Sequence, residues 1–316
     1  MATSLNQGNI SMKASTFQAA WSRTHPDAEW RDLTPDEIED FGRDGVICLR
    51  GLYSQSWLQL LAEELDAIAQ GEVGVSGPSI QGYYEWMKRD RVRDFVLFGP
   101  TAKPVRQALG SSRLNFFYDQ VFIKEGLQAA PTPWHHDYTF WPIAGNQIAS
   151  VWAAMEPVTA EGSALEFVAG SHLWQRQFKA IAVSGADVSN RPLEDVPDIE
   201  ADRDAYRIVS WDLEPGDALL FHALTLHGAR GNAMARRRRA ITTRWTGDDA
   251  LYNEAGALPR FLWDPRLNDG DPLSGRIFPQ VLPTLIDAEI EERMRGPIPP
   301  EPKQVEKLLA ARRGMS

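Results

Sequence analysis

Two imidazoles and a carboxylate occupy consecutive positions of the chain, at His135, His136 and Asp137. In an extended strand the side chains alternate between two faces, so His135 and Asp137 point to one side and His136 points to the other. An imidazole and a carboxylate on one face supply two parts of a facial triad, the kind of site in which ferrous iron keeps other positions open. The third ligand must come from another part of the chain.

Two histidines after a Pro-Gly-Asp turn at residues 215–217 are the candidates for this third ligand. An apolar strand is expected to follow the turn, and His222 comes directly after it. His227 stands directly before Gly228, where a strand end would open toward a site. We prefer His227 and keep His222 as the alternative. A single histidine here would be structural, but the His-x-Asp pair with a later His-Gly favours a metal site.

A run of four arginines at residues 236–239 leads into another expected strand. Such a run is normally solvated, but alternation places Arg238 with Ala240 and Thr242 on one face and Arg239 on the other. If the face of Arg238 is the interior, its guanidinium is a buried charge that requires an anionic partner. A bound carboxylate would supply that partner through two hydrogen bonds.

Four further side chains are candidates for the co-substrate end of a pocket. Gln120 shares one face of its expected strand with Phe122 and Lys124, and Trp152 lies on the next long strand. For each of them a structural role fits equally well. We expect His136, on the opposite face from His135, and His172, in a Gly-Ser-His turn, to be structural.

The elements that hold these residues are predicted to be mainly β-strands with flanking helices. The Thr34, Pro35 and Glu37 pattern predicts a capped helix start, and apolar residues recur at helical spacing over residues 57–68. A short helix is expected near residues 105–109. The expected strands are residues 46–49, 114–124, 148–155, 164–168, 206–211, 218–221 and 239–245. Short strands preceded by helices indicate an antiparallel double-sheet barrel with a helical layer on one face.

The chain is predicted to form one domain. Residues 1–30 are expected to be a loose leader, residues 31–296 the barrel domain with its helical layer and a C-terminal wrap, and residues 297–316 a tail with a short helix. The polar, acidic segment 178–206 is expected to be an insertion that shapes a pocket mouth.

Composition limits the class of protein and its partners. The 316 residues carry a formal net charge of −10, which argues against nucleic-acid and anionic-membrane binding. The lone Cys48 cannot form an internal disulfide, and no apolar run reaches the 18 residues of a membrane span. We therefore expect a cytoplasmic protein whose partner is a small molecule.

The chain resembles the phytanoyl-CoA dioxygenase (PhyH) family of iron(II)- and 2-oxoglutarate-dependent oxygenases. The resemblance rests on the combination of His135-x-Asp137, His227-Gly228, Asn232 and Arg238. The similarity extends over roughly residues 33–250 and includes residues 33–51, 161–172 and 215–217. It implies a double-stranded β-helix of the jelly-roll, cupin-like type. It also implies that His135, Asp137 and His227 bind iron and that Arg238 binds the distal carboxylate of 2-oxoglutarate. Many members have a serine where this chain has Ala229, which removes one hydroxyl contact to the co-substrate.

The expected function is that of a dioxygenase that consumes O2 and 2-oxoglutarate, releases succinate and CO2, and hydroxylates or otherwise oxidises a small, mainly apolar metabolite. Asp137 fills the position that a halide would need, which disfavours a halogenase. One alternative is a non-catalytic, cupin-like metal or small-acid binding protein, but a bare metal site does not require a buried Arg238. Another is a zinc hydrolase, but the helical His-Glu-x-x-His spacing of zinc proteases is missing.

The nature of the substrate is the least constrained prediction. Six aromatic residues stand in or beside segments expected near the pocket mouth and suit an apolar ligand, although they could equally belong to the core. A free molecule is preferred to a CoA thioester. Basic residues in segment 88–93 could nevertheless gather into a phosphate-binding patch. The aromatic residues are Tyr83, Tyr84, Trp86, Tyr138, Phe140 and Trp141, and the basic ones are Lys88, Arg89, Arg91 and Arg93.

Overall fold

The computed structural model describes residues 31–282, apart from residues 71–74, 77–78, 128–130, 161, 182–185, 190, 255–264 and 276. The predicted leader and the C-terminal tail with its expected short helix lie outside the described residues. The proposed domain boundaries therefore remain predictions.

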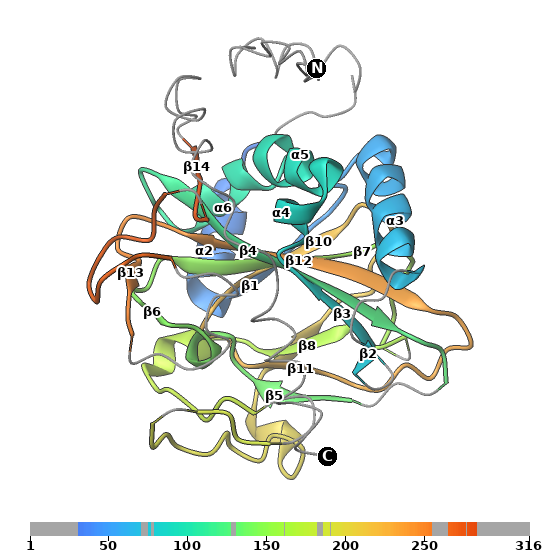
Figure 1. The fold of residues 1–316 in the computed structure, drawn as a ribbon. Helices are drawn as coiled ribbons and strands as arrows, with labels where there is room; N and C mark the ends of the chain where they lie inside the picture. The colour runs from blue at the N-terminus through green and yellow to red at the C-terminus, as the bar shows by residue number, and fades with distance from the viewer. Residues whose placement is uncertain are drawn as a thin grey trace, which may run out of the picture.

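Two antiparallel sheets face each other and form a jelly-roll core that is not closed into a complete barrel (Figure 1). The larger sheet runs in the order β1 (Val46–Leu49), β10 (Ala218–His222), β7 (Ile148–Ala154), β12 (Arg238–Thr246), β4 (Leu114–Lys124), β3 (Ser79–Tyr83) and β2 (Val75–Ser76), and β14 (Gln280–Leu282) also pairs with β4. The smaller sheet runs in the order β5 (Thr132–His135), β11 (His227–Ala229), β8 (Leu165–Val168) and β9 (Ile208–Ser210). The predicted mainly-β fold class is confirmed.

Helices cover the outer face of the larger sheet, as the sequence predicted (Figure 1). They are α2 (Pro35–Asp44), α3 (Gln55–Gln70), α4 (Glu85–Lys88), α5 (Asp90–Phe98) and α6 (Ala102–Ala108). The capping box at the start of α2 is confirmed, because the Thr34 hydroxyl accepts a hydrogen bond from the Glu37 N–H at 3.1 Å and the Glu37 carboxylate accepts one from the Thr34 N–H at 2.9 Å. Among the described residues, no helix has the length and hydropathy needed to cross a membrane.

The inner face of the larger sheet packs against the smaller sheet. Trp152 of β7 and Ala240 of β12 share a buried apolar cluster with Leu165, Phe167 and Ala229 of the smaller sheet. Because side chains alternate along β12, Arg238 lies on the same inner face as Ala240. The predicted orientation of Arg238 toward the interior is therefore confirmed.

Two details of the fold differ from the sequence predictions. β5 ends at His135, and Asp137 adopts a helical backbone conformation (φ −68°, ψ −31°) at the start of the 3-10 helix η1 (Tyr138–Phe140). Strand alternation therefore does not bring His135 and Asp137 together. Instead, the chain turns immediately after the strand.

The insertion at residues 178–206, whose role at a pocket mouth stays a prediction, packs against the smaller sheet. Phe178 and Ile199 form a small buried cluster with Val168 and Leu226 on the outer face of the smaller sheet. The Phe178 N–H donates to His136 Nε2 at 2.9 Å, and His136 points away from its neighbour His135. The described part of the insertion thus supports the strands of the site from behind.

The remaining short elements flank these sheets. They are β6 (Ile143–Ala144), β13 (Leu251–Tyr252), η2 (Ser171–Trp174) and η3 (Arg203–Ala205).

Candidate metal and co-substrate site

His135 and His227 are direct partners across neighbouring strands. β5 and β11 pair antiparallel with His227 opposite His135, so both imidazoles project from the same face of the smaller sheet. Gly228 allows this close pairing, because a Cβ atom at position 228 would lie 3.1 Å from the carbonyl oxygen of Thr132 on β5. The ring centroids of the two histidines are 4.3 Å apart.

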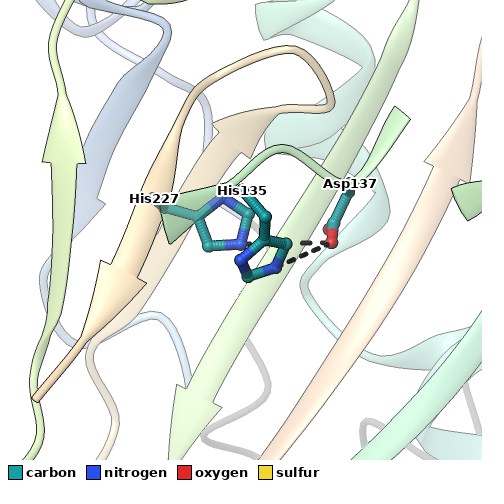
Figure 2. Close-up of side chains that lie close together, drawn as sticks. All are labelled: His135, Asp137 and His227. Atoms are coloured by element: carbon teal, nitrogen blue, oxygen red, sulfur yellow. Dashed lines mark ion pairs between the residues drawn. The ribbon is translucent and has the colours of Figure 1, made fainter. Parts of the chain in front are cut away.

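Asp137 completes a compact group of three possible metal ligands (Figure 2). Its Oδ1 atom lies 3.9 Å from Nε2 of His135 and 4.0 Å from Nε2 of His227, and one ligand atom of each residue lies within 4.8 Å of the others. Nitrogen and oxygen ligands about 2.1 Å from a common ion are about 3–4 Å from each other. The three side chains thus have the spacing of a metal site.

Hydrogen bonds fix the orientation of both imidazoles. His135 Nδ1 lies 2.8 Å from the carbonyl oxygen of Pro133, and His227 Nδ1 lies 3.0 Å from that of Thr225. A ring nitrogen that faces a carbonyl oxygen carries the proton, so Nε2 of each ring presents a lone pair to the site. Burial lowers the pKa of His227 to about 4, which keeps this ligand neutral near pH 7.

Asp137 is held through its outer oxygen. Ser150 of β7 donates its hydroxyl hydrogen bond to Oδ2 at 2.8 Å, and Nε of Arg244 on β12 lies 3.7 Å from the same oxygen. Burial opposes ionisation of Asp137, but the charge of Arg244 and the neighbouring histidines outweigh it and lower the pKa of the carboxyl group below its usual value. The inner oxygen, Oδ1, faces the histidines.

The alternative ligand His222 is not part of this group. Its Nε2 donates to the carbonyl oxygen of Asn146 at 2.6 Å, and its Nδ1 accepts from the Leu224 N–H at 3.1 Å. Both ring nitrogens are therefore used within the fold. His172, which we expected to be structural, lies beside His222 with ring centroids 5.4 Å apart.

The four arginines of the run at 236–239 have different environments. Arg237 pairs with Glu125 at 2.8 Å, Arg239 pairs with Glu156 at 2.6 Å, and Arg236 is exposed. Arg238 alone in the run is buried without an ion pair to any described carboxylate. Its Nη1 donates to the Ser163 carbonyl oxygen at 2.5 Å, and its Nε has no hydrogen-bond partner among the described residues. This arrangement indicates that the partner of Arg238 is an acidic ligand.

Lys124 is a second buried cation at the same place. It is opposite Arg238 in the β4–β12 register and is 4% exposed. Its ammonium group donates to the hydroxyl groups of Thr132 and Ser163, each at 3.1 Å. Burial, followed by the charge of Arg238, lowers the pKa of Lys124 to about 7. Two facing cations whose hydrogen-bond partners among the described residues are all neutral oxygens suit an anionic ligand.

Two other predicted co-substrate residues lie in different places. Trp152 lies beside Arg238, whose guanidinium carbon is 5.2 Å from the indole centroid. Gln120 instead accepts a hydrogen bond from Arg244 at 2.9 Å and donates one to the Tyr83 hydroxyl at 3.0 Å. The structure therefore groups Gln120 with Arg244, and its contact with the co-substrate remains a prediction.

Sequence reasoning missed Ser150, Ser163 and Arg244, whereas alternation along its strand placed Lys124 among the residues expected at the co-substrate end of the pocket. Arg244 could have been found, because it is six residues after Arg238 and the same alternation places it on the inner face. Ser150 and Ser163 show no local signal, since their importance depends on pairing between distant strands.

Comparison with known families decides the classification of the chain. The model of the family "Phytanoyl-CoA dioxygenase (PhyH)" matches residues 41–240, which is more than half of the sequence. The chain belongs to this family. It is 27% identical over 241 residues to the peroxisomal phytanoyl-CoA dioxygenase of Rattus norvegicus, with 70% of each protein covered. It is also 27% identical over 237 residues to a multifunctional dioxygenase of Penicillium brasilianum, with 65% of this chain and 70% of that protein covered.

Solved structures show the same fold. A non-haem, α-ketoglutarate-dependent carbocyclase from nogalamycin biosynthesis superimposes with a TM-score of 0.64 at 23% identity, covering 78% of this chain and 96% of that one. An epimerase from the same biosynthesis, in complex with Fe3+, α-ketoglutarate and nogalamycin RO, gives a TM-score of 0.64 at 24% identity, covering 78% of this chain and 97% of that one.

The PhyH chain is thus a non-haem iron, 2-oxoglutarate-dependent dioxygenase, and the alternative of a non-catalytic binding protein is not supported. Its co-substrates are 2-oxoglutarate and O2. The side chains of the site fit a ferrous ion and 2-oxoglutarate. Two imidazoles and one carboxylate suit ferrous iron, and a buried pair of cations suits the distal carboxylate of the co-substrate.

Proposed function

We propose that His135, Asp137 and His227 hold the ferrous ion of this dioxygenase. The proposal is supported by the Nε2 and Oδ1 atoms of the three side chains, which converge within 4.8 Å while hydrogen bonds occupy their outer atoms. Three protein ligands on one side leave the remaining positions of the ion for 2-oxoglutarate and O2.

Arg238 and Lys124 bind the distal carboxylate of 2-oxoglutarate in this proposal. Arg238 supplies a planar pair of donors, and Lys124 supplies an ammonium group from the opposite strand. The pair also accounts for Ala229, whose partner in the β5–β11 register is Thr132. Lys124 contacts the Thr132 hydroxyl. Its ammonium group therefore lies where a serine at position 229 would otherwise offer a hydroxyl contact to 2-oxoglutarate.

Iron with 2-oxoglutarate supplies an oxidative decarboxylation, in which one atom of O2 enters succinate and the other is delivered to a C–H bond of the substrate. The protein's part is to hold both co-substrates and to keep bulk water away. Phe140 and Phe221 contribute to this exclusion, since their rings lie 5.7 Å from the ring of His135 and 4.8 Å from that of His227, respectively.

The proposed substrate is a free, mainly apolar small molecule that undergoes hydroxylation or another C–H oxidation. The basic residues near 88–93 support this choice, because carboxylates already neutralise them. Lys88 pairs with Glu85 at 2.7 Å, Arg91 pairs with Glu63 at 2.8 Å, Arg89 pairs with Glu64 and Glu85, and Arg93 pairs with Asp90. A CoA phosphate would have to displace these ion pairs.

The predicted aromatic wall is mostly part of the core. Tyr84, Trp86 and Trp141 are at most 4% exposed and belong to the main apolar cluster, so they form no lining near the surface. The apolar character of the substrate is supported instead by Phe140 and Phe221 beside the proposed iron ligands.

The test of this function is succinate release from 2-oxoglutarate in the presence of Fe(II), together with binding of Mn(II) as an inert substitute. The His227→Ala variant should lose both turnover and Mn(II) affinity, whereas His222→Gln should keep both in the folded protein. The opposite result would show that the ligand assignment is wrong. If acyl-CoAs stimulated succinate release far better than the corresponding free acids, the proposed substrate class would be wrong.

A further inference from the structure

Arg244 is a second buried arginine at the iron site, and the proposed co-substrate contacts do not use it. It is 4% exposed and lies on the inner face of β12 with Arg238. Its guanidinium carbon lies 4.6 Å from the ring centroid of Tyr118 and 5.5 Å from that of Trp141. These rings hold the guanidinium in place without neutralising its charge.

The donors of Arg244 are only partly used. A guanidinium has five N–H groups. Nη2 donates to Gln120 at 2.9 Å, whereas Nε and Nη1 have no hydrogen-bond partner among the described residues. Asp137 lies 3.7 Å from Nε, which is close enough for charge attraction but too long for a good hydrogen bond. Buried donors without acceptors are costly, so an additional acceptor is expected when the site is filled.

The charge of the interior points to the same conclusion. The charged side chains described on the inner face of the larger sheet are Lys124, Arg238 and Arg244, and Asp137 faces them from η1. A ferrous ion and doubly charged 2-oxoglutarate cancel each other, so loading both does not remove the excess of positive charge. The ligand carboxylate Asp137 must then share its charge between the ion and Arg244.

Arg238 and Arg244 cannot serve the same carboxylate. They are six residues apart on β12, which places their Cα atoms about 20 Å apart at about 3.3 Å per residue. Their guanidinium groups also have separate partners, Ser163 for Arg238 and Gln120 for Arg244. In the proposed function Arg238 binds the distal carboxylate of 2-oxoglutarate and the ion binds its proximal carboxylate, so the second guanidinium is left for the other small molecule of the reaction.

We propose that Arg244 binds an acidic oxygen group of the oxidised substrate, so that the substrate is an apolar molecule that carries a carboxylate or a similar delocalised oxyanion. This inference rests on the proposed function, since it assigns 2-oxoglutarate to Arg238. A planar guanidinium with donors to spare matches a planar oxyanion. Anchoring one end of the substrate beside Asp137 fixes which C–H bonds lie next to the ion.

The experiment uses simple acids as probes, because the substrate is unidentified. The full-length protein is saturated with Mn(II) and 2-oxoglutarate, and benzoate, cyclohexanecarboxylate and their primary amides are titrated by calorimetry. We expect each acid to bind at least about tenfold more tightly than its amide, as a charge-assisted hydrogen bond provides. In Arg244→Met this preference should disappear, whereas Arg244→Lys should keep part of it and the exposed-site control Arg236→Met should keep all of it.

Two results would overturn the assignment. One is the absence of any preference for the acids in the natural sequence, including failure of both acids and amides to bind at millimolar concentration. The other is an Arg244→Met variant that keeps the preference, or that weakens 2-oxoglutarate binding as much as Arg238→Gln does. Should Arg244→Met fail to fold, the preference for acids over amides in Arg244→Lys and in the natural sequence still tests the assignment. Failure of the proposed function is recognised separately, because the protein would then not bind 2-oxoglutarate in the first loading step.

Discussion

Hydrogen bonds to the outer atoms of His135, Asp137 and His227 determine which of their atoms face the centre of the site. Nδ1 of each histidine donates a hydrogen bond to a backbone carbonyl oxygen, and the Ser150 hydroxyl donates one to the outer oxygen of Asp137. The partners of each cation likewise distinguish a functional cation from a structural one. Arg239 has carboxylate partners, whereas the partners of Arg238 and Lys124 in the described part of the chain are all neutral oxygens.

The first prediction concerns Arg238. Replacing it with Gln removes a charge-assisted contact of about 1.5–3 kcal/mol, so the KM for 2-oxoglutarate should rise at least about tenfold. The measurement is succinate release at varied 2-oxoglutarate concentration. The matched control is Arg236→Gln, since Arg236 belongs to the same run but is exposed. An unchanged KM in Arg238→Gln would remove Arg238 from the site.

The second prediction concerns the proton on Lys124. Its pKa of about 7 means that the buried amine is mostly neutral at pH 8 in the free protein. A bound carboxylate favours the charged ammonium and raises this pKa, so 2-oxoglutarate binding at pH 8 should take up a proton. Calorimetry of the Mn(II)-loaded protein in Tris and in phosphate should then give different binding enthalpies. Lys124→Met should abolish the difference, and equal enthalpies in the two buffers with the natural sequence would contradict the assignment.

At the scale of elements, the smaller sheet brings His135 and His227 together. They lie opposite each other only because β5 and β11 approach closely at Gly228. The sequence predicted β4 with its exact bounds and β7, β8 and β10 to within a residue, because alternating apolar residues and turns are local signals. It did not predict the end of β5 at His135 or the pairing of Lys124 with Arg238. These depend on contacts between segments far apart in the chain.

The third prediction tests the approach of β5 and β11. In Gly228→Ala the new methyl group would lie 3.1 Å from the Thr132 carbonyl oxygen, a tight contact that we expect to shift β5 by a few tenths of an ångström and to change the spacing of His135 and His227. Mn(II) affinity should fall about tenfold, as it does when residues that orient metal ligands are changed. The control is Gly42→Ala in α2, where no atom lies within 4 Å and the substitution should stabilise the helix by about 0.5–1 kcal/mol. Unchanged Mn(II) affinity in Gly228→Ala would show that this spacing does not control the site.

Across the whole molecule, the net charge of the chain and the charge on the inner face of the larger sheet have opposite signs. The chain carries a net charge of −10, yet the inner face of the larger sheet carries Lys124, Arg238 and Arg244. Neutral buried histidines accompany these cations. Burial lowers the pKa of His136 to about 3 and that of His222 to about 4, and it acts in the same direction on His227. The fold thus excludes further positive charge from its interior.

The last prediction follows from these histidines. A histidine with a pKa near 6.5 when unfolded and about 4 when folded binds its proton more readily in the unfolded chain. Its contribution to stability is therefore complete above pH 6.5 and is lost as the pH falls toward 4. For His222 alone, the loss between pH 7.5 and pH 5 is about 2 kcal/mol, at about 1.4 kcal/mol for each pH unit below 6.5. Urea unfolding of the metal-free protein at the two pH values measures this change. Because Gln cannot be protonated, the free energy of unfolding of His222→Gln should fall by about 2 kcal/mol less than that of the natural sequence over the same interval. Equal losses in the two proteins would mean that His222 is not the group that titrates.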